Sequence, residues 1–278
     1  MKGIWAAFVA LELATTGCTT NPRPVAPAIL PAVERSSAVI LHGKSLELHL
    51  SAPQGGQTAN ALVLYASGDG GWFGAAVDMF HRIGGAGYYT VGFSAKAFLK
   101  IDRQPDTPMN PEQLAAEYEQ ILDTARRELR LQSGTEVVLT GWSRGAAFAV
   151  LAASAHGAPR GVRGVLAIGL SEGEDLAIDG PADESDEGTA AETRNHWPFE
   201  PYALMALLPF RCAVIQATRD NYLAAARART LFGSDTEKRR LYAIDARNHR
   251  FSGGKDAFDR ALLDALEWIS SGVRPQES

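Results

Sequence analysis

The sequence predicts an α/β domain in which helices cover both faces of a mostly parallel sheet. Short, almost continuous apolar runs alternate along the chain with segments of helical periodicity. Runs of this kind are typical of strands buried on both faces, and the connections between them are long enough for crossover helices. The runs occupy residues 61–67, 89–94, 136–142, 164–170, 212–218 and 240–246.

Three further segments extend this pattern. Residues 46–50, "LELHL", alternate apolar and polar side chains, as an edge strand or an antiparallel strand does. A helix is expected to begin after Asn110, because asparagine is a good N-cap and Pro111 suits the first helical position. The last helix lies within residues 257–272 and is expected to end at Gly272.

Length and composition indicate one globular domain. The chain has 278 residues, of which 46% are hydrophobic, so it can bury a sizeable core. A formal net charge of −5, without a cluster of lysine and arginine, argues against nucleic acid as a partner. We assign residues 37–272 to this domain. Within it, residues 171–209 are acidic and irregular, and we expect a lid-like insertion there or a solvated surface loop.

The N-terminal region has the features of an export signal followed by a linker. A short apolar run after an N-terminal lysine leads to small residues and Cys18, so residues 1–17 are expected to be a signal peptide. Residues 18–36 are expected to be a flexible linker. The segment resembles a bacterial lipoprotein signal, which predicts lipidation of Cys18 and anchoring to the membrane on the periplasmic side. Export without a lipid, with removal of Cys18, is the alternative. The other cysteine, Cys212, is expected to pack in the core.

A G-x-S-x-G motif, "GWSRG" at residues 141–145, supplies a candidate nucleophile. It follows a predicted buried strand and precedes a run of good helix formers, so Ser143 is expected in a sharp turn between strand and helix. Such a turn is crowded, needs small neighbours and lifts the hydroxyl above the carboxyl edge of the sheet. The motif alone is weak, because a glycine-rich turn that serves only the fold has the same letters.

A nucleophilic serine needs a base and an acid that orients the base. When the nucleophile lies in a turn of this kind, they follow in the order serine, acid, histidine. His249 is the only histidine beyond residue 220 and follows the last predicted strand. Asp220 follows the preceding strand and is the expected acid. Asp245 and Asp175 remain alternatives to Asp220.

Acyl transfer also needs two N–H donors for the oxyanion. One is expected from Arg144, directly after the nucleophile. The other is expected from Asp69 or Gly70, in the glycine-rich loop after the first buried strand. Trp72 in the same loop is a candidate for the wall of the substrate pocket, and a core position beneath the loop is its alternative.

Three segments resemble, in order and spacing, the bacterial VirJ/AcvB-type virulence-protein family of exported α/β-hydrolases. They are "SGDGGW" (67–72), "TGWSRGA" (140–146) and "NHRF" (248–251). The resemblance extends over roughly residues 60–270. Trp142 and Arg144 depart from the family's pattern beside the nucleophile. These differences bear on the identity of the substrate more than on the type of reaction.

The resemblance implies an α/β-hydrolase fold and a periplasmic serine hydrolase. Its substrate would be aminoacylated phosphatidylglycerol, such as the lysyl or alanyl ester, with Ser143 as nucleophile, Asp220 as acid and His249 as base. We expect no metal and no organic cofactor. Two alternatives stay open: a general periplasmic esterase or lipase, and a non-catalytic binding partner of an envelope or secretion complex.

Overall fold

The computed structural model describes residues 32–54, 61–101, 109–175 and 198–271. The expected signal peptide, Cys18 and Gly272 lie outside these residues, as does most of the expected linker. Within the described ranges, no helix is both long and apolar enough to cross a membrane.

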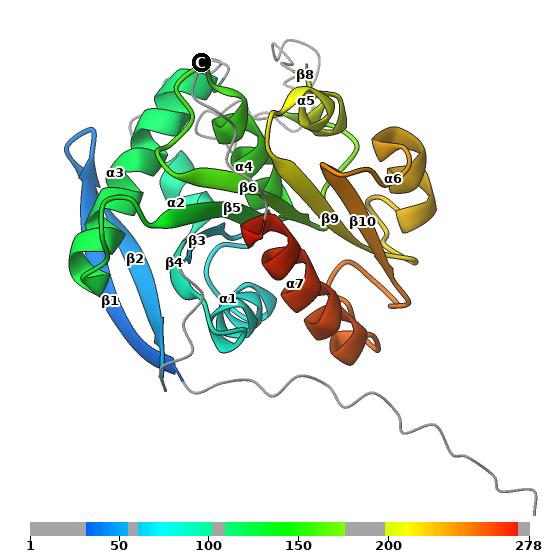
Figure 1. Ribbon diagram of the computed structural model, residues 1–278, viewed down its shortest axis with the longest axis horizontal. Helices are drawn as coiled ribbons and strands as arrows, with labels where there is room; N and C mark the ends of the chain where they lie inside the picture. Colours follow the sequence, from blue (N-terminus) through cyan, green and yellow to red (C-terminus); the bar gives the residue numbers. More distant parts are fainter. Residues whose placement is uncertain (1–31, 55–60, 102–108, 176–197, 272–278) are drawn as a thin grey trace, which may run out of the picture.

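An eight-stranded mixed sheet forms the centre of the molecule (Figure 1). Its strands are β1 (Ala32–Leu41), β2 (Lys44–Pro53), β3 (Ala61–Ala66), β4 (Tyr89–Phe93), β5 (Glu136–Trp142), β6 (Val162–Ile168), β9 (Arg211–Ala217) and β10 (Arg239–Ile244). They lie in the order β1-β2-β4-β3-β5-β6-β9-β10. The first two pairings, β1 with β2 and β2 with β4, are antiparallel, and all the others are parallel. The predicted mostly parallel sheet is therefore confirmed.

The N-terminal edge of the sheet agrees with one prediction and corrects another. The alternating segment 46–50 lies in β2, which is antiparallel to both neighbours, so its antiparallel alternative is confirmed, and β1 forms the edge. Residues 32–36, assigned to the linker, instead form the first half of β1 and pair with β2. Most side chains of this half are exposed, because an edge strand has a neighbouring strand on one side only. Its sequence is therefore as polar as that of a linker.

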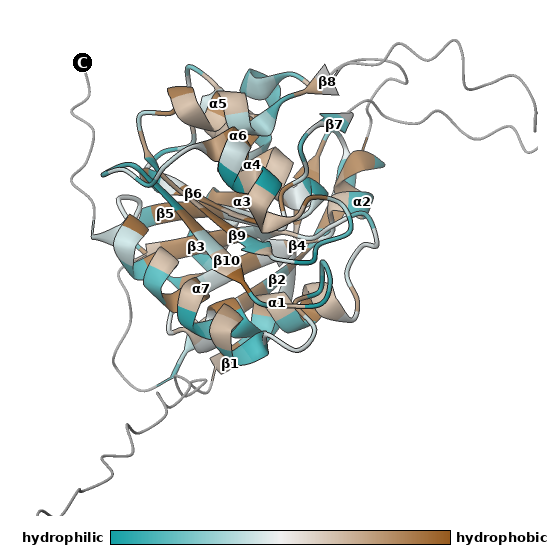
Figure 2. Ribbon diagram, turned by 90° about the vertical axis from the view of Figure 1, so that its right-hand side faces the viewer, coloured by the Kyte–Doolittle hydropathy of each residue, from teal (hydrophilic) through white to brown (hydrophobic). Residues whose placement is uncertain are grey.

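Helices cover both faces of the sheet. They are α1 (Ala75–Gly85), α2 (Ala95–Leu99), α3 (Pro111–Leu129), α4 (Arg144–Ser154), α5 (Pro201–Leu207), α6 (Ala225–Phe232) and α7 (Lys255–Ser270). Helices α1 and α7 pack on one face, where Phe80 and Phe258 belong to a single core. The other helices pack on the opposite face around Tyr118 and Phe148. Figure 2 shows the apolar strands between these layers.

The helix boundaries follow local signals in the sequence. The Asn110 side chain accepts hydrogen bonds from the N–H groups of Glu112 and Gln113 at 2.9 and 3.1 Å, and Pro111 opens α3 as predicted. These bonds satisfy donors that the first turn of a helix leaves without partners.

The insertion is less irregular than the sequence indicated. Within residues 171–209, β7 (Glu174–Asp175) pairs with β8 (Pro198–Phe199), and α5 follows. Residues 176–197 lie outside the described part of the chain. The predicted irregular insertion therefore contains regular structure at both of its described ends.

Candidate active site

Ser143 lies in the turn that connects β5 to α4. Its backbone has φ 58° and ψ −123°, a strained conformation for a residue with a side chain. A Cβ atom on Gly141 would lie 2.1 Å from the carbonyl carbon of Gly145. A Cβ atom on Gly145 would lie 2.1 Å from the carbonyl oxygen of Ala66. Both positions therefore require glycine, which is the physical reason for the G-x-S-x-G spacing.

Asp220 and His249 form a buried hydrogen-bonded pair. Asp220 Oδ2 lies 2.8 Å from His249 Nδ1, and the two side chains are 0% and 9% exposed. Asp220 Oδ1 accepts a hydrogen bond from the N–H of Tyr222 at 2.9 Å, and Gln216 Nε2 donates to Oδ2 at 3.2 Å. These contacts fix the carboxylate in one orientation towards the ring. A carboxylate at Nδ1 keeps the proton on that nitrogen, which leaves Nε2 as the acceptor.

The ring of His249 is held on several sides. Trp142 stacks on it with the ring centroids 5.3 Å apart, and Tyr222 meets it edge-on at 4.8 Å. A Cβ atom on Gly169 would lie 2.7 Å from His249 Cε1, so the ring rests on bare backbone. His249 Nε2 is buried and has no hydrogen-bond partner among the residues that the structure describes. Since Trp142 directly precedes Ser143, its stacking places the His249 ring next to the turn that carries the candidate nucleophile.

The two alternative acids occupy other positions. The carboxylate of Asp245 is 86% exposed and pairs with Arg219 at 2.9 Å. Asp175 lies in β7, and its side chain is outside the description. Of the three acids that the sequence offered, Asp220 is the one that the structure brings to His249.

The loop after β3 lies directly against the nucleophile. A Cβ atom on Gly68 would lie 3.2 Å from Ser143 Cβ. The N–H of Ser67 already donates to Phe93 at 3.1 Å, and the N–H of Gly71 donates to Gly68 at 3.0 Å. This loop therefore has a fixed backbone beside Ser143.

The expected oxyanion hole takes the N–H of Arg144 and that of either Asp69 or Gly70. Among the described residues, no acceptor takes a hydrogen bond from the N–H of Asp69, Gly70 or Arg144. The assignment of an oxyanion hole to these groups stays a prediction, and the open donors are compatible with it.

The side chain of Arg144 connects two segments beside the nucleophile. Its Nε lies 2.6 Å from Asp69 Oδ1 and 3.8 Å from Glu174 Oε2. Ser171 donates a hydrogen bond to Glu174 Oε1 at 2.6 Å. Burial raises the pKa of the Glu174 carboxyl, against the opposing effects of Ser171 and Arg144. With both carboxylates ionised, this cluster carries two negative charges and one positive charge.

The ring of Trp72 packs over the N-terminal part of the sheet. Its ring stacks on His49 with centroids 4.1 Å apart and meets the edge of Phe80 at 5.2 Å. A Cβ atom on Gly92 would lie 2.3 Å from Trp72 Cη2, so the indole covers the backbone of β4. These contacts match the core alternative. A part for Trp72 in substrate binding stays a prediction.

Several residues of the site were not found from the sequence. Gly169 and Tyr222 meet the histidine ring only through the fold, and Gln216 lies inside a strand whose apolar letters gave no signal. Glu174 stood among many acidic residues. Trp142 had a usable signal, because it directly precedes the candidate nucleophile.

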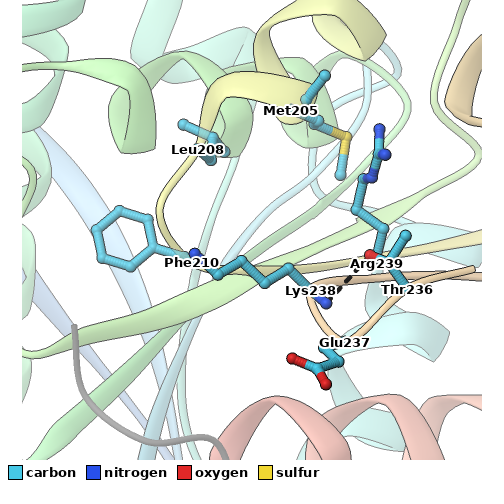
Figure 3. A pocket seen from close by; sticks show the side chains of 8 residues that line it. Met205, Leu208, Phe210, Thr236, Glu237, Lys238 and Arg239 are labelled. Atoms are coloured by element: carbon cyan, nitrogen blue, oxygen red, sulfur yellow. Dashed lines mark hydrogen bonds between the residues drawn. The ribbon is translucent and has the colours of Figure 1, made fainter.

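The pocket in Figure 3 lies apart from this site. It has a volume of about 370 Å³ and is lined by residues that include Met205, Phe210 and Lys238. These residues come from the segments that lead into β9 and β10, at the amino ends of the strands, whereas Ser143, Asp220 and His249 follow carboxyl ends. Among the described residues, no three His, Cys, Asp or Glu side chains are grouped as metal ligands would be.

Comparison with known proteins agrees with this architecture. Residues 60–184 match the family described as bacterial virulence protein (VirJ). The esterase domain of a Rhodothermus marinus protein is 15% identical, with a TM-score of 0.55, and the match covers 85% of this chain and 98% of that one. A search of curated proteins finds no significant match.

Two further solved structures have the same fold. A putative dienelactone hydrolase from Klebsiella pneumoniae is 12% identical, with a TM-score of 0.60 and coverage of 87% of this chain and 100% of that one. Est1E from Butyrivibrio proteoclasticus is 12% identical, with a TM-score of 0.56 and coverage of 85% and 99%. The chain therefore has an α/β-hydrolase fold, and its residues 60–184 match the VirJ family of bacterial virulence proteins.

Proposed function

We propose that the protein is an exported serine hydrolase that cleaves carboxylic esters through an acyl-enzyme. The observation that carries this proposal is the buried Asp220–His249 pair, whose ring stacks on the residue before Ser143 and whose Nε2 has no partner among the described residues. A buried ionisable pair of this kind contributes little to stability even when it is hydrogen-bonded, so its presence beside a strained serine favours a catalytic use.

The reaction would proceed in two halves. His249 Nε2 takes the proton of the Ser143 hydroxyl as its oxygen attacks the ester carbonyl, and the N–H groups of Arg144 and Asp69 or Gly70 stabilise the oxyanion. The C–O bond to the alcohol then breaks, and the imidazolium gives its proton to the leaving oxygen. Water repeats the sequence on the acyl-enzyme and releases the acid. Asp220 holds the ring and stabilises its charge throughout.

The substrate that we propose is the aminoacyl ester of aminoacylated phosphatidylglycerol. The family match supports it, and so does the charge beside the nucleophile. The ammonium of a lysyl or alanyl group would enter a site in which Asp69 and Glu174 outnumber the single guanidinium of Arg144. We further propose that lipidation at Cys18 holds the enzyme on the periplasmic side of the membrane that contains this ester.

A general esterase is the second candidate, because solved structures with this fold include the Rhodothermus marinus esterase domain and Est1E. The deciding experiment offers the purified protein lysyl- and alanyl-phosphatidylglycerol beside short p-nitrophenyl esters. Release of free amino acid at a higher kcat/KM than the simple esters supports the lipid substrate. Turnover of the simple esters alone would reject it.

A non-catalytic binding partner is the third possibility. Labelling with a fluorophosphonate probe separates it from the enzymes, since only an activated serine reacts. A mass adduct on Ser143 is expected, and its absence from folded protein would favour the binding role.

The mature N-terminus, determined by mass spectrometry, tests the proposed lipid anchor. A terminus other than lipid-modified Cys18 would refute the anchor.

A further inference from the structure

A second cavity lies beside the catalytic edge of the sheet. It has a volume of about 240 Å³, opens to solvent and lies between the amino ends of α1 and α7, which are on the same face (Figure 1). Its polar lining consists of Arg82, Arg250, Lys255, Asp78 and Ser252. None of these residues takes part in the mechanism proposed above.

Both walls of this cavity continue segments of the candidate active site. Gly74 ends the loop that carries Asp69 and Gly70, and it lines the cavity on one side. Arg250 directly follows His249 and lines the other side. A substrate whose ester lay at Ser143 would therefore have its leaving group close to this cavity, since His249 must reach the leaving oxygen.

The charges of the cavity favour an anion. Arg82 is paired with both carboxylate oxygens of Asp259. Lys255 Nζ lies 3.6 Å from Asp78 Oδ2, with both side chains more than half exposed, so this contact is weak. Arg250 is exposed, and among the described residues no carboxylate pairs with it. The three cations Arg82, Lys255 and Arg250 thus outnumber the carboxylates of Asp78 and Asp259. The cation without a carboxylate partner among the described residues is Arg250, which directly follows the proposed base, His249.

We propose that this cavity binds the phosphodiester of the substrate's leaving group. The proposal rests on the proposed function: in an aminoacylated phosphatidylglycerol, the scissile ester and the phosphodiester are attached to the same glycerol unit. A guanidinium binds phosphate oxygens in pairs and stays charged at any physiological pH. Arg250 would be the main ligand, and Lys255 would turn from Asp78 to the incoming anion. The negative cluster at Asp69 and Glu174 would then receive the ammonium, and the cavity the phosphate.

The first test compares two kinds of substrate with one pair of variants. Arg250→Gln removes the unpaired cation, and Arg260→Gln removes an exposed cation from the same helix layer away from the cavity. We expect Arg250→Gln to lower kcat/KM for lysyl-phosphatidylglycerol about tenfold or more, mainly through KM, as loss of a charge-assisted contact does. Its rate on p-nitrophenyl acetate, which has no phosphate, should equal that of Arg260→Gln. Arg250→Lys should recover part of the loss. Equal losses on both substrates, or no loss on either, would overturn the proposal.

The second test does not depend on turnover. Calorimetric titration with glycerophosphoglycerol, which is a phosphodiester, should give binding to the wild-type protein and to Arg260→Gln, and about tenfold weaker binding to Arg250→Gln. Unchanged binding in Arg250→Gln would overturn the subsite. Inorganic phosphate that binds as tightly as glycerophosphoglycerol would overturn its assignment to a lipid headgroup. If the wild-type protein binds glycerophosphoglycerol through Arg250 but cleaves no aminoacyl lipid, the proposed function fails while the subsite stands.

Discussion

Asp220 Oδ2 lies 2.8 Å from His249 Nδ1 at a place where both side chains are almost completely removed from water. This hydrogen bond joins the loop after β9 to the loop after β10, 29 positions apart in the sequence. It leaves one ring nitrogen, Nε2, for chemistry. The relationship yields specific expectations for variants of the nucleophile, the acid and the surroundings of the ring.

Ser143→Ala should abolish ester turnover. Without the hydroxyl no acyl-enzyme forms, and loss of a serine nucleophile in a comparable triad lowers kcat by about 10⁶-fold. The fluorophosphonate adduct should disappear as well. Circular dichroism and thermal melting should stay close to those of the wild-type protein, because alanine differs from serine at this strained φ only by the hydroxyl. An adduct that persisted would place the nucleophile elsewhere.

Asp220→Asn should lower kcat by about 10⁴-fold while the protein stays folded. The amide of asparagine can donate to Nδ1, which moves the ring proton to Nε2 and removes the acceptor that Ser143 needs. Asp245→Asn is the matched control, because its exposed carboxylate pairs with Arg219. Steady-state kinetics of the two variants on one p-nitrophenyl ester decide the point. Similar rates in both would contradict the role of Asp220.

Gly169→Ala should damage both stability and catalysis. Alanine at the positive φ of Gly169 costs about 1–2 kcal/mol. Its Cβ would also lie 2.7 Å from His249 Cε1 and push the ring from its place. We expect kcat to fall even at a temperature where the variant is fully folded, so that unfolding cannot account for the loss. Gly134→Ala serves as control, since a Cβ there meets nothing within 4 Å. Wild-type kcat in Gly169→Ala would show that the ring does not depend on this contact.

Glu174→Gln should change how stability depends on pH. Burial raises the pKa of the Glu174 carboxyl in the folded protein, so the folded state favours the protonated form. The ionised carboxylate therefore opposes folding above this raised pKa, and the cost vanishes as pH falls below the ordinary pKa of the unfolded chain. The melting temperature of Glu174→Gln minus that of the wild-type protein should be larger at pH 7 than at about pH 4. A difference independent of pH would contradict the ionised state that we assign to Glu174 at neutral pH.

The sequence predicted those parts of the site that depend on the order of elements. Ser143 was found because a strand, a glycine-flanked turn and a helix leave a pattern in the letters. Asp220 and His249 followed from the places where strands end. Contacts made by packing left no such pattern: the edge of Tyr222 against His249, and the bare backbone of Gly169 beneath it, depend on how distant segments meet.

The misassigned half of β1 and the two alternatives left for Trp72 have a common physical origin. The first half of β1 has polar letters because an edge strand leaves most of its side chains in water, so nothing separated it from the linker. For Trp72 the sequence left a pocket wall and a core position open; its ring stacks on His49 over a glycine of β4, and a part in substrate binding stays a prediction. In both cases the deciding contact is made with β2, a neighbouring strand whose position the local sequence does not indicate.

The candidate catalytic residues come from two halves of the chain that meet where β6 pairs with β9. Ser143 and the loop after β3 precede this boundary, and Asp220 and His249 follow it, while five residue pairs from Gly164–Arg211 to Ile168–Ile215 hold the halves together in parallel register. A chain split within residues 176–197 would give two fragments, neither with a complete set of reacting groups. Co-expression of the fragments would then report on assembly of the sheet, because the proposed hydrolysis would return only when β9 docks on β6.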